Sequence, residues 1–233
     1  MAKLIVNDIE IELIKKNIKN LHLSVHPPNG RVRISAPKRM DDEAIRLFVI
    51  SKLSWIKKQR SKFVKQERQS EREFVSGESH YFLGERYLLN VNYTNKRKQG
   101  VKIRNKTYID LFVREGSTKE QRQNVMKEWY RRELKALIPP LIEKWEQIIG
   151  VKVESWGVRL MKTRWGSCNT TAKRIWVNLA LAKKNPACLE YIIVHEMVHL
   201  LERLHNERFI SYMDKFLPNW RSIKSELNGL VFE

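Results

Sequence analysis

Two histidines, His195 and His199, lie four residues apart inside an apolar segment, and this pattern constrains the fold more than any other part of the chain. On a helix, a rotation of about 100° per residue places both imidazoles on one face, one turn apart. The flanking segments 191–194 and 200–201 are apolar, which is typical of a buried helix. Buried imidazoles must be paired or ligated to offset their lost hydration. The pattern therefore predicts a metal-binding helix in a protein core.

The glutamate between the histidines, Glu196, lies beside the face that would hold the metal. There it can accept a proton from water without ligating the metal itself, which is the equipment of a zinc hydrolase. A catalytic zinc site normally has three protein ligands, and His205, Glu202 and Glu207 are the candidates for the third. A straight helix would carry Glu202 away from the metal. His205 is therefore favoured, at the ten-residue spacing from His195 that metzincins use, although the glycine that metzincins place at position 202 is missing.

Four motifs, one of which contains His195 and His199, extend the pattern in both directions. KTRWGSC covers residues 162–168, IWVNLAL covers 175–181, YIIVHEMVHL covers 191–200 and HNERF covers 205–209. With these motifs, and with LHLSV, GRVRISAP and SWIKKQR in the N-terminal half, the chain resembles the YgjP-like family of minimal metallopeptidases, relatives of the SprT-like and WLM groups. The resemblance implies a zincin fold and a zinc-dependent peptidase, with His195, His199 and His205 as ligands and Glu196 as the catalytic base. It leaves the natural substrate undefined.

The expected reaction is hydrolysis of a peptide bond. Zinc would lower the pKa of a water molecule towards about 7, and Glu196 would take the proton and pass it to the leaving amine. The oxyanion needs a second donor, and the sequence does not choose among Arg164, Asn178 and Tyr212. An edge strand near residues 174–179 could hold an extended substrate by strand addition.

Composition limits where such a protein could work. The chain has 233 residues, of which 42% are hydrophobic, no apolar run long enough to cross a membrane, and an N-terminus that reaches acidic residues too early for a signal peptide. Its two cysteines, Cys168 and Cys188, offer no disulfide framework, so we expect a reducing, cytoplasmic location. Both are interpreted as small apolar residues, although Cys168 as a fourth ligand would indicate a structural zinc site.

The net charge of +19 is the second unusual feature. Residues 1–115 carry 25 Lys and Arg against 13 Asp and Glu, and residues 116–233 carry 20 against 13. Part of the excess lies on one helix, at Lys57, Lys58, Lys62 and Lys65, and part around a hairpin at residues 96–106. Such clusters bind nucleic acid by counterion release, whereas the alternative is a solvated basic surface.

The expected fold is α+β in two parts, a basic N-terminal region over 1–115 and a zincin-like domain over 116–233. Alternation predicts a hairpin over 21–36, and Asp41 caps a helix expected to reach about Gln69. Short strands follow over 73–115. A capping box at Thr118 and Gln121 begins a helix that Pro139 and Pro140 are expected to interrupt.

The second part is expected to place a β-hairpin before the metal-binding helix. Its strands are predicted over 151–160 and 174–179, joined by a turn at Trp165 and Gly166, and Asn185 with Pro186 begins the helix. The function predicted overall is a zinc metallopeptidase, with proteins bound to nucleic acid as one substrate class that the basic half suggests. The alternatives are a nucleic-acid-binding protein with a structural zinc, and an adaptor that has lost activity. The sequence leaves the oligomeric state open.

Overall fold

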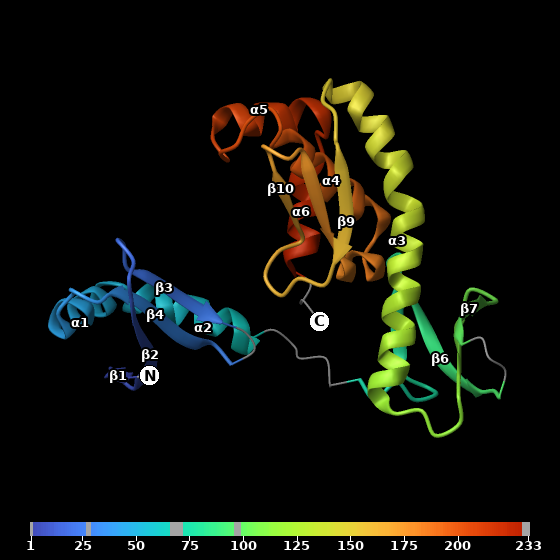
Figure 1. Cartoon of the computed structure of the whole chain (residues 1–233), viewed down its shortest axis with the longest axis horizontal. Coiled ribbons are helices and arrows are strands. Elements are labelled where there is room, and N and C mark those ends of the chain that lie inside the picture. Colours follow the sequence, from blue (N-terminus) through green and yellow to red (C-terminus); the bar gives the residue numbers. More distant parts are fainter. Residues whose placement is uncertain (1, 27–28, 66–71, 96–98, 230–233) are drawn as a thin grey trace. The chain divides into compact units, whose positions relative to one another are not determined.

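The computed structural model describes residues 2–26, 29–65, 72–95 and 99–229, and the chain divides into two compact units, Met1–Arg68 and Gln69–Glu233 (Figure 1). The sequence predicted a boundary between residues 115 and 116. The division comes earlier because the strands between residues 79 and 113 belong to the larger unit, where they pack on its long helix. The fold is α+β, as predicted.

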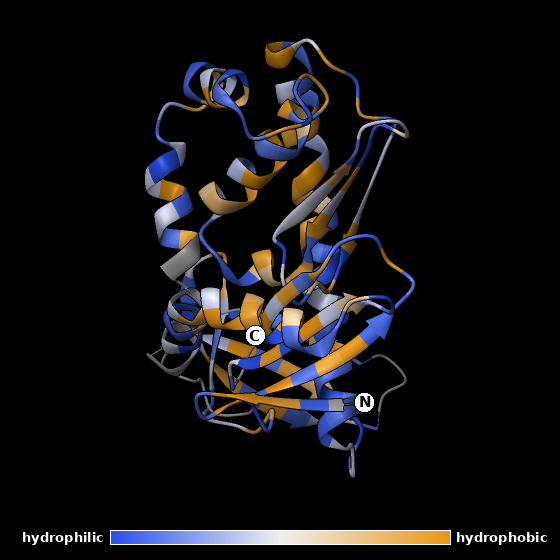
Figure 2. Cartoon of the chain, turned by 90° about the vertical axis from the view of Figure 1, so that its left-hand side faces the viewer, coloured by the Kyte–Doolittle hydropathy of each residue, from blue (hydrophilic) through white to orange (hydrophobic). Residues whose placement is uncertain are grey.

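The smaller unit is a four-stranded sheet with two helices. The strand order is β1-β2-β4-β3, and the bounds are β1 Ala2–Val6, β2 Ile9–Lys16, β3 His22–His26 and β4 Arg31–Pro37. The predicted hairpin is confirmed as β3 and β4, with Leu23 opposite Ile34. Figure 2 shows polar and apolar residues alternating along the strands, as one buried sheet face requires.

Two helices, α1 Asp42–Ser51 and α2 Leu53–Lys65, follow this sheet. Asp41 caps α1 as predicted. The prediction of a single helix from there to Gln69 was wrong, because α1 ends at Ser51, with Lys52 as its C-cap, and a second helix runs from Leu53 to Lys65. Residues 66–69 lie outside the described residues. Buried apolar side chains of both helices and of the sheet form one core, including Ile11, Ile34, Ile45, Val49 and Ile56.

The larger unit begins with a second four-stranded sheet in the order β5-β6-β8-β7. Its bounds are β5 Ser79–Phe82, β6 Glu85–Tyr93, β7 Gly100–Arg104 and β8 Tyr108–Val113. Helix α3, Lys119–Ile149, packs against this sheet and is started by the predicted capping box of Thr118 and Gln121. The predicted interruption at Pro139 and Pro140 was wrong, since α3 is continuous through both. Buried Ile138 and Ile142 flank the prolines, and their packing offsets the hydrogen bonds that the prolines remove.

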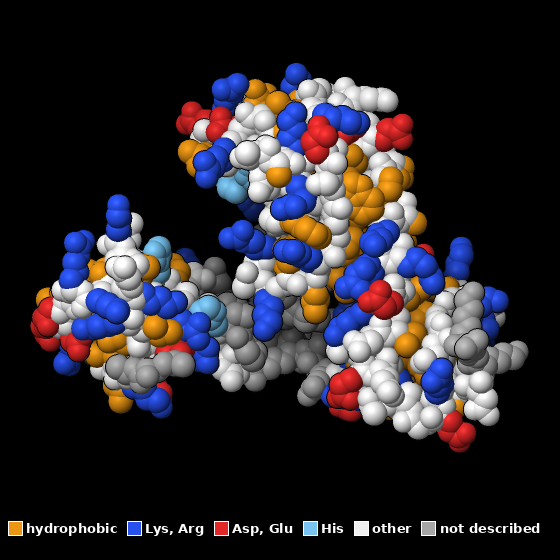
Figure 3. Space-filling view, in the orientation of Figure 1, with side chains coloured by type: hydrophobic (Ala, Val, Ile, Leu, Met, Phe, Trp, Pro, Cys, Tyr) orange, Lys and Arg blue, Asp and Glu red, His pale blue; other side chains and the backbone are white. Residues whose placement is uncertain are grey.

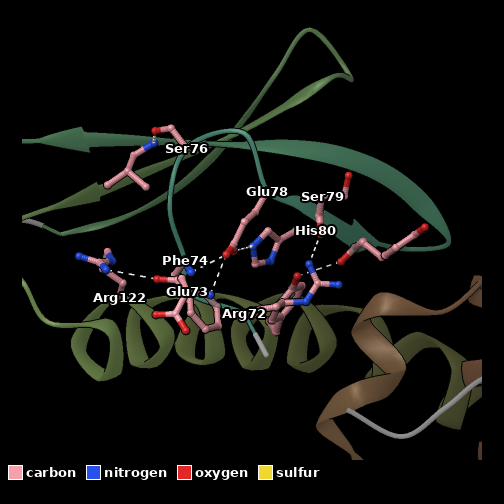
Figure 4. Close-up of polar contacts among 11 residues, drawn as sticks. Arg72, Glu73, Phe74, Ser76, Glu78, Ser79, His80 and Arg122 are labelled. Carbon is pink, nitrogen blue, oxygen red and sulfur yellow. Dashed lines mark hydrogen bonds and ion pairs between the residues drawn. The ribbon is translucent and has the colours of Figure 1, made fainter. Parts of the chain in front are cut away.

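A compact polar turn holds the start of this unit against α3 (Figure 4). The carboxylate of Glu78 accepts hydrogen bonds from the backbone N–H groups of Glu73 at 2.7 Å and Phe74 at 2.9 Å. The same carboxylate lies 3.2 Å from Nε2 of His80, whose pKa burial lowers to about 4. Arg122 of α3 donates to the carbonyl of Glu73 at 3.2 Å. These contacts fix the entry of the chain into the larger unit.

A third sheet carries the segments that the motifs singled out. It contains β9 Ser155–Arg159, β10 Gly166–Asn169 and β11 Arg174–Asn178 in the order β10-β11-β9. The antiparallel hairpin is formed by β10 and β11, while β9 pairs with β11 in parallel. The prediction of a hairpin between 151–160 and 174–179 was therefore wrong, and β11 is a central strand, not an edge.

Four helical segments complete the larger unit: the 3-10 helix η1 Leu179–Lys183 and the helices α4 Pro186–Val198, α5 Glu207–Phe216 and α6 Trp220–Gly229. As predicted, Asn185 caps α4 and Pro186 occupies its first turn. Helix α4 is buried along most of its length and contacts α3, α5, α6 and the third sheet. None of the described helices has the length and apolarity needed to cross a bilayer.

Candidate metal centre and active site

Three imidazoles converge where α4 ends and the chain turns back into α5. Nε2 of His195 lies 3.0 Å from Nε2 of His205, and the candidate ligand atoms of His195, His199 and His205 lie within 4.8 Å of one another. His199 is the C-cap of α4. Its Nδ1 lies 3.1 Å from the backbone carbonyl of Glu202, and donation there leaves Nε2 free for a ligand. The structure thus brings together the three histidines that the sequence singled out.

The donor set suits a divalent metal ion. Burial, and then the neighbouring His199 and His205, lower the pKa of His195 to about 3, and burial lowers the pKa of His199. Both imidazoles are therefore neutral at physiological pH, the form in which histidine binds a metal. A ring nitrogen that carries no proton offers a lone pair, and a cation bound among the three rings could accept one lone pair from each.

A buried phenylalanine forms the floor of the cluster. The ring of Phe209, on α5, lies 4.9 Å from that of His195, 4.8 Å from His199 and 4.7 Å from His205, measured between centroids. Its side chain is 2% exposed. One aromatic ring therefore fixes the orientation of all three imidazoles and excludes water from below them.

Glu196 lies in the core next to this cluster and is only 5% exposed. Burial raises the pKa of its carboxyl to about 8, against the opposing effect of the positive Arg164. Gly166 of β10 packs directly on this side chain, because a Cβ atom there would lie 2.6 Å from Oε1 of Glu196 and 2.8 Å from Cγ2 of Ile192. The strand and the helix can approach this closely only because residue 166 is glycine.

The cluster opens into a cavity of about 860 Å³ whose lining includes all three histidines and Glu196. Every residue of β10 lines it, and so does Arg164, just before that strand. Cys168 also lines it. Burial, and then the nearby Glu196, raise the pKa of its thiol to about 11, so the thiol stays protonated. Among the described residues, the group that could hold a metal contains the three histidines and not Cys168.

Two of the three predicted oxyanion donors lie elsewhere. The amide of Asn178 is buried and fully used: it donates to the carbonyls of Met161 at 2.9 Å and Arg164 at 2.7 Å, and accepts from the N–H groups of Met161 and Ala180. It holds the loop before β10 in place. Tyr212, on α5, accepts from the guanidinium of Arg208 and is not among the residues lining the cavity.

The remaining candidates also lie apart from the metal group. The carboxylate of Glu202 accepts from the N–H of Leu204 at 3.2 Å, and Glu207 lies in the first turn of α5. Lys57, Lys58, Lys62 and Lys65 all belong to α2 in the smaller unit. Lys57 and Lys58 are exposed, whereas the side chains of Lys62 and Lys65 lie outside the described residues.

Sequence reasoning missed four residues that shape this site: Gly166, Tyr191, Phe209 and Lys224. Tyr191 precedes His195 by one turn of α4, and its apolar surroundings made it look like core. Its ring meets that of His195 edge to face at 5.8 Å, and burial raises the pKa of its hydroxyl to about 12. Phe209 could have been found from the sequence, because it ends the HNERF motif. Lys224 could not, because it lies in α6, outside every motif, and reaches the cavity only through the tertiary fold.

Comparison with known proteins gives one match over most of the chain. Residues 19–230 match the family described as "YgjP-like, metallopeptidase domain". No match was found among curated proteins. Among solved structures, the chain is similar to the metallopeptidase zymogen abylysin of Pyrococcus abyssi, with 20% sequence identity and a TM-score of 0.36, over 38% of this chain and 89% of that one.

Proposed function

This chain belongs to the YgjP-like metallopeptidase family, and on that premise we propose that it is a zinc-dependent peptidase whose zinc is held by His195, His199 and His205. The observation that carries the proposal is the convergence of three imidazoles beside a buried carboxyl. Catalytic zinc sites use three protein ligands and keep a fourth position open, whereas structural sites are closed by four. A fourth protein ligand, Cys168 included, is absent from the cluster within the described residues.

Glu196 is the proposed general base and acid. When bound, zinc would supply Lewis acidity and a hydroxide nucleophile at neutral pH. A carboxyl with a pKa close to the working pH both accepts and returns a proton efficiently, and burial brings the pKa of Glu196 into that range. Glu196 would take the proton of the attacking water and deliver it to the leaving amine.

Arg164 is the proposed partner of the developing oxyanion. It lines the cavity and acts on the charge of Glu196, whereas the amide of Asn178 is already committed to backbone groups. The hydroxyl of Tyr191 is a second donor in the cavity lining, and its raised pKa keeps it protonated. Fixed donors in a site shielded from water stabilise developing charge strongly.

The substrate backbone is proposed to pair with β10 in place of the 174–179 segment expected from sequence. Strand β10 is an edge of its sheet, and its four residues all line the cavity. An extended peptide can add to such an edge through main-chain hydrogen bonds. That arrangement would hold the scissile carbonyl along the wall that faces Glu196.

The variant Glu196→Gln tests this assignment. Its amide cannot accept a proton, so we expect hydrolysis of an unstructured peptide to fall by about 10³-fold while the protein keeps its zinc. Glu202→Gln is the matched control and should keep near wild-type activity, since Glu202 contacts the backbone of Leu204. Cleavage by Glu196→Gln at the wild-type rate would remove Glu196 from the mechanism.

A second function, nucleic-acid binding, is favoured by one feature of the smaller unit. Exposed Lys57 and Lys58 directly follow the buried Ile56 on α2, and Trp55, 42% exposed, directly precedes it. Lysines neutralise phosphates and an exposed indole can stack on bases. We propose that this surface brings the peptidase to proteins bound to nucleic acid. The free thiols Cys168 and Cys188 support a reducing, cytoplasmic location for that work.

A further inference from the structure

The cavity around the proposed active site is lined by three cationic side chains and, apart from Glu196, by no acidic one within the described chain. The three come from different parts of the larger unit: Arg164 from the loop before β10, Arg203 from the turn after α4, and Lys224 from α6. Figure 3 shows Lys and Arg side chains on either side of a histidine at the edge of this unit. Three cationic side chains from separate elements therefore line one cleft.

These three cations lack the partners that other surface cations of the same unit have. Lys144 pairs with Glu190 at 2.7 Å and Lys152 with Glu146 at 2.8 Å. For Arg164, Arg203 and Lys224, all exposed, the described residues offer no carboxylate within ion-pair distance. Apart from Glu196, on whose charge Arg164 acts, the cleft offers these cations no counter-charge among the described residues, and a bound anionic group would relieve their mutual repulsion.

Lys224 also stands over an apolar surface. Leu227, one turn further along α6, and Tyr191 of α4 both line the cavity and are buried. Nζ of Lys224 lies 5.2 Å from the ring of Trp220, and its charge is close enough to His195 to lower the pKa of that imidazole. An apolar floor beneath an ammonium group suits a glutamate side chain, whose methylenes can lie on the floor while its carboxylate meets Nζ.

We propose that this cleft selects peptides with acidic side chains next to the bond that is cut, and that Lys224 and Arg203 are specificity-determining residues. The inference rests on the proposed peptidase function and names its substrate class. A peptide is favoured over a small anion because the open edge of β10 offers backbone groups that an extended chain can pair with. Alternate side chains of such a strand would point to the same side, so acidic residues two apart should bind best.

Binding to the Glu196→Gln protein, loaded with zinc, tests this proposal separately from catalysis. Three fluorescent peptides of equal length, alternating Ala with Glu, Gln or Lys, are compared by anisotropy. We expect the Glu peptide to bind about 10-fold more tightly than the Gln peptide, the Lys peptide to bind most weakly, and the preference to shrink with salt. Lys224→Met and Arg203→Gln should each reduce the Glu-over-Gln preference by about threefold.

Lys215→Gln is the control, since Lys215 is exposed on α5 and does not line the cavity; it should leave the preference unchanged. Equal binding of the Glu and Lys peptides, or a preference that survives both cleft variants, would overturn the proposal. Displacement of the Glu peptide by an equal concentration of inorganic phosphate would assign the cations to a phosphate ligand and also overturn it. Hydrolysis of the Gln peptide by wild-type protein tests the peptidase function alone, so the two failures are distinguishable.

Discussion

The two units differ in whether they bury polar and ionisable side chains. In the smaller unit the described buried side chains are all apolar, whereas the larger unit buries His80, Asp110, Ser117, Asn178 and Glu196. Two glutamates make the contrast concrete. Glu12, in the smaller unit, accepts from Arg33 at 3.0 Å, and that hydrogen bond lowers its pKa. Glu196 is cut off from water, and burial raises its pKa to about 8. A carboxylate paired with arginine stays ionised, whereas a desolvated one with a raised pKa is suited to proton transfer.

Among changes to the buried site that distinguishes the larger unit, the largest loss of zinc affinity and activity is expected from replacing the third histidine, His205. His205→Ala would remove one of the three proposed ligands, so we expect zinc affinity to fall by more than the 10- to 100-fold that is typical of losing an outer-shell partner, and hydrolysis to be lost with it. Glu202→Ala should keep both. Metal analysis of the two purified variants, with activity measured on the same samples, decides between them; equal zinc retention would remove His205 from the site.

The second effect concerns how tightly the sheet holds the buried carboxyl. In Gly166→Ala the new methyl would overlap Oε1 of Glu196, so the carboxyl must move, and we expect kcat to fall by about 10²-fold. Gly100→Ala adds a methyl where nothing lies within 4 Å and should change little. Steady-state kinetics of both variants measures the difference. Full activity in Gly166→Ala would show that the close approach of β10 does not position Glu196.

The third effect is on stability. Asn178→Ala leaves several buried backbone groups around Met161 and Arg164 without partners, which should lower the free energy of unfolding by about 3 kcal/mol. Asn169→Ala is the comparison, because Asn169 bonds to the exposed Ala172 N–H, where water can replace it. Urea denaturation measures both. If Asn178→Ala were as stable as Asn169→Ala but inactive, Asn178 would act in the chemistry after all.

The smallest effect is expected in the smaller unit. Changing Lys57, Lys58, Lys62 and Lys65 together to Glu should weaken binding to single-stranded nucleic acid and flatten its salt dependence by about 0.7 in the log-log slope for each lost phosphate contact. Changing the same four to Arg keeps the charge and should keep the slope. Fluorescence titrations at several salt concentrations provide the measurement. Binding that is undetectable in the wild type would leave these lysines as a solvated surface.

Helix starts could be predicted from local sequence patterns, whereas contacts between segments that are distant in the sequence could not. The capping box at Thr118 and the cap of α4 at Asn185 need only neighbouring residues, and both were confirmed. Pro139 and Pro140 misled because packing around α3 outweighs their local cost. The place of β11 at the centre of its sheet depends on β9, which pairs with it across more than ten intervening residues.

The candidate site divides in the same way. The spacing of His195, His199 and His205 along the sequence was sufficient to single out a group whose nitrogens converge. Among the residues that other elements contribute, Arg164 was named from the KTRWGSC motif, but the packing of Gly166 on Glu196 was not foreseen, and Lys224 had no sequence signal because α6 is far from the motifs along the chain. Asn178 was interpreted as a possible donor to the substrate because the sequence alone does not distinguish an amide that supports a loop from one that binds a ligand.

The most direct test of the central claim is a zinc titration of chelator-treated wild-type protein, with hydrolysis of an unstructured peptide as the readout. Activity should be absent without metal, rise in proportion to added zinc, and stop rising at one zinc per chain. Activity that persists without metal, or that fails to appear at any zinc concentration although zinc binds, would contradict the assignment of this cluster as the active site of a zinc peptidase.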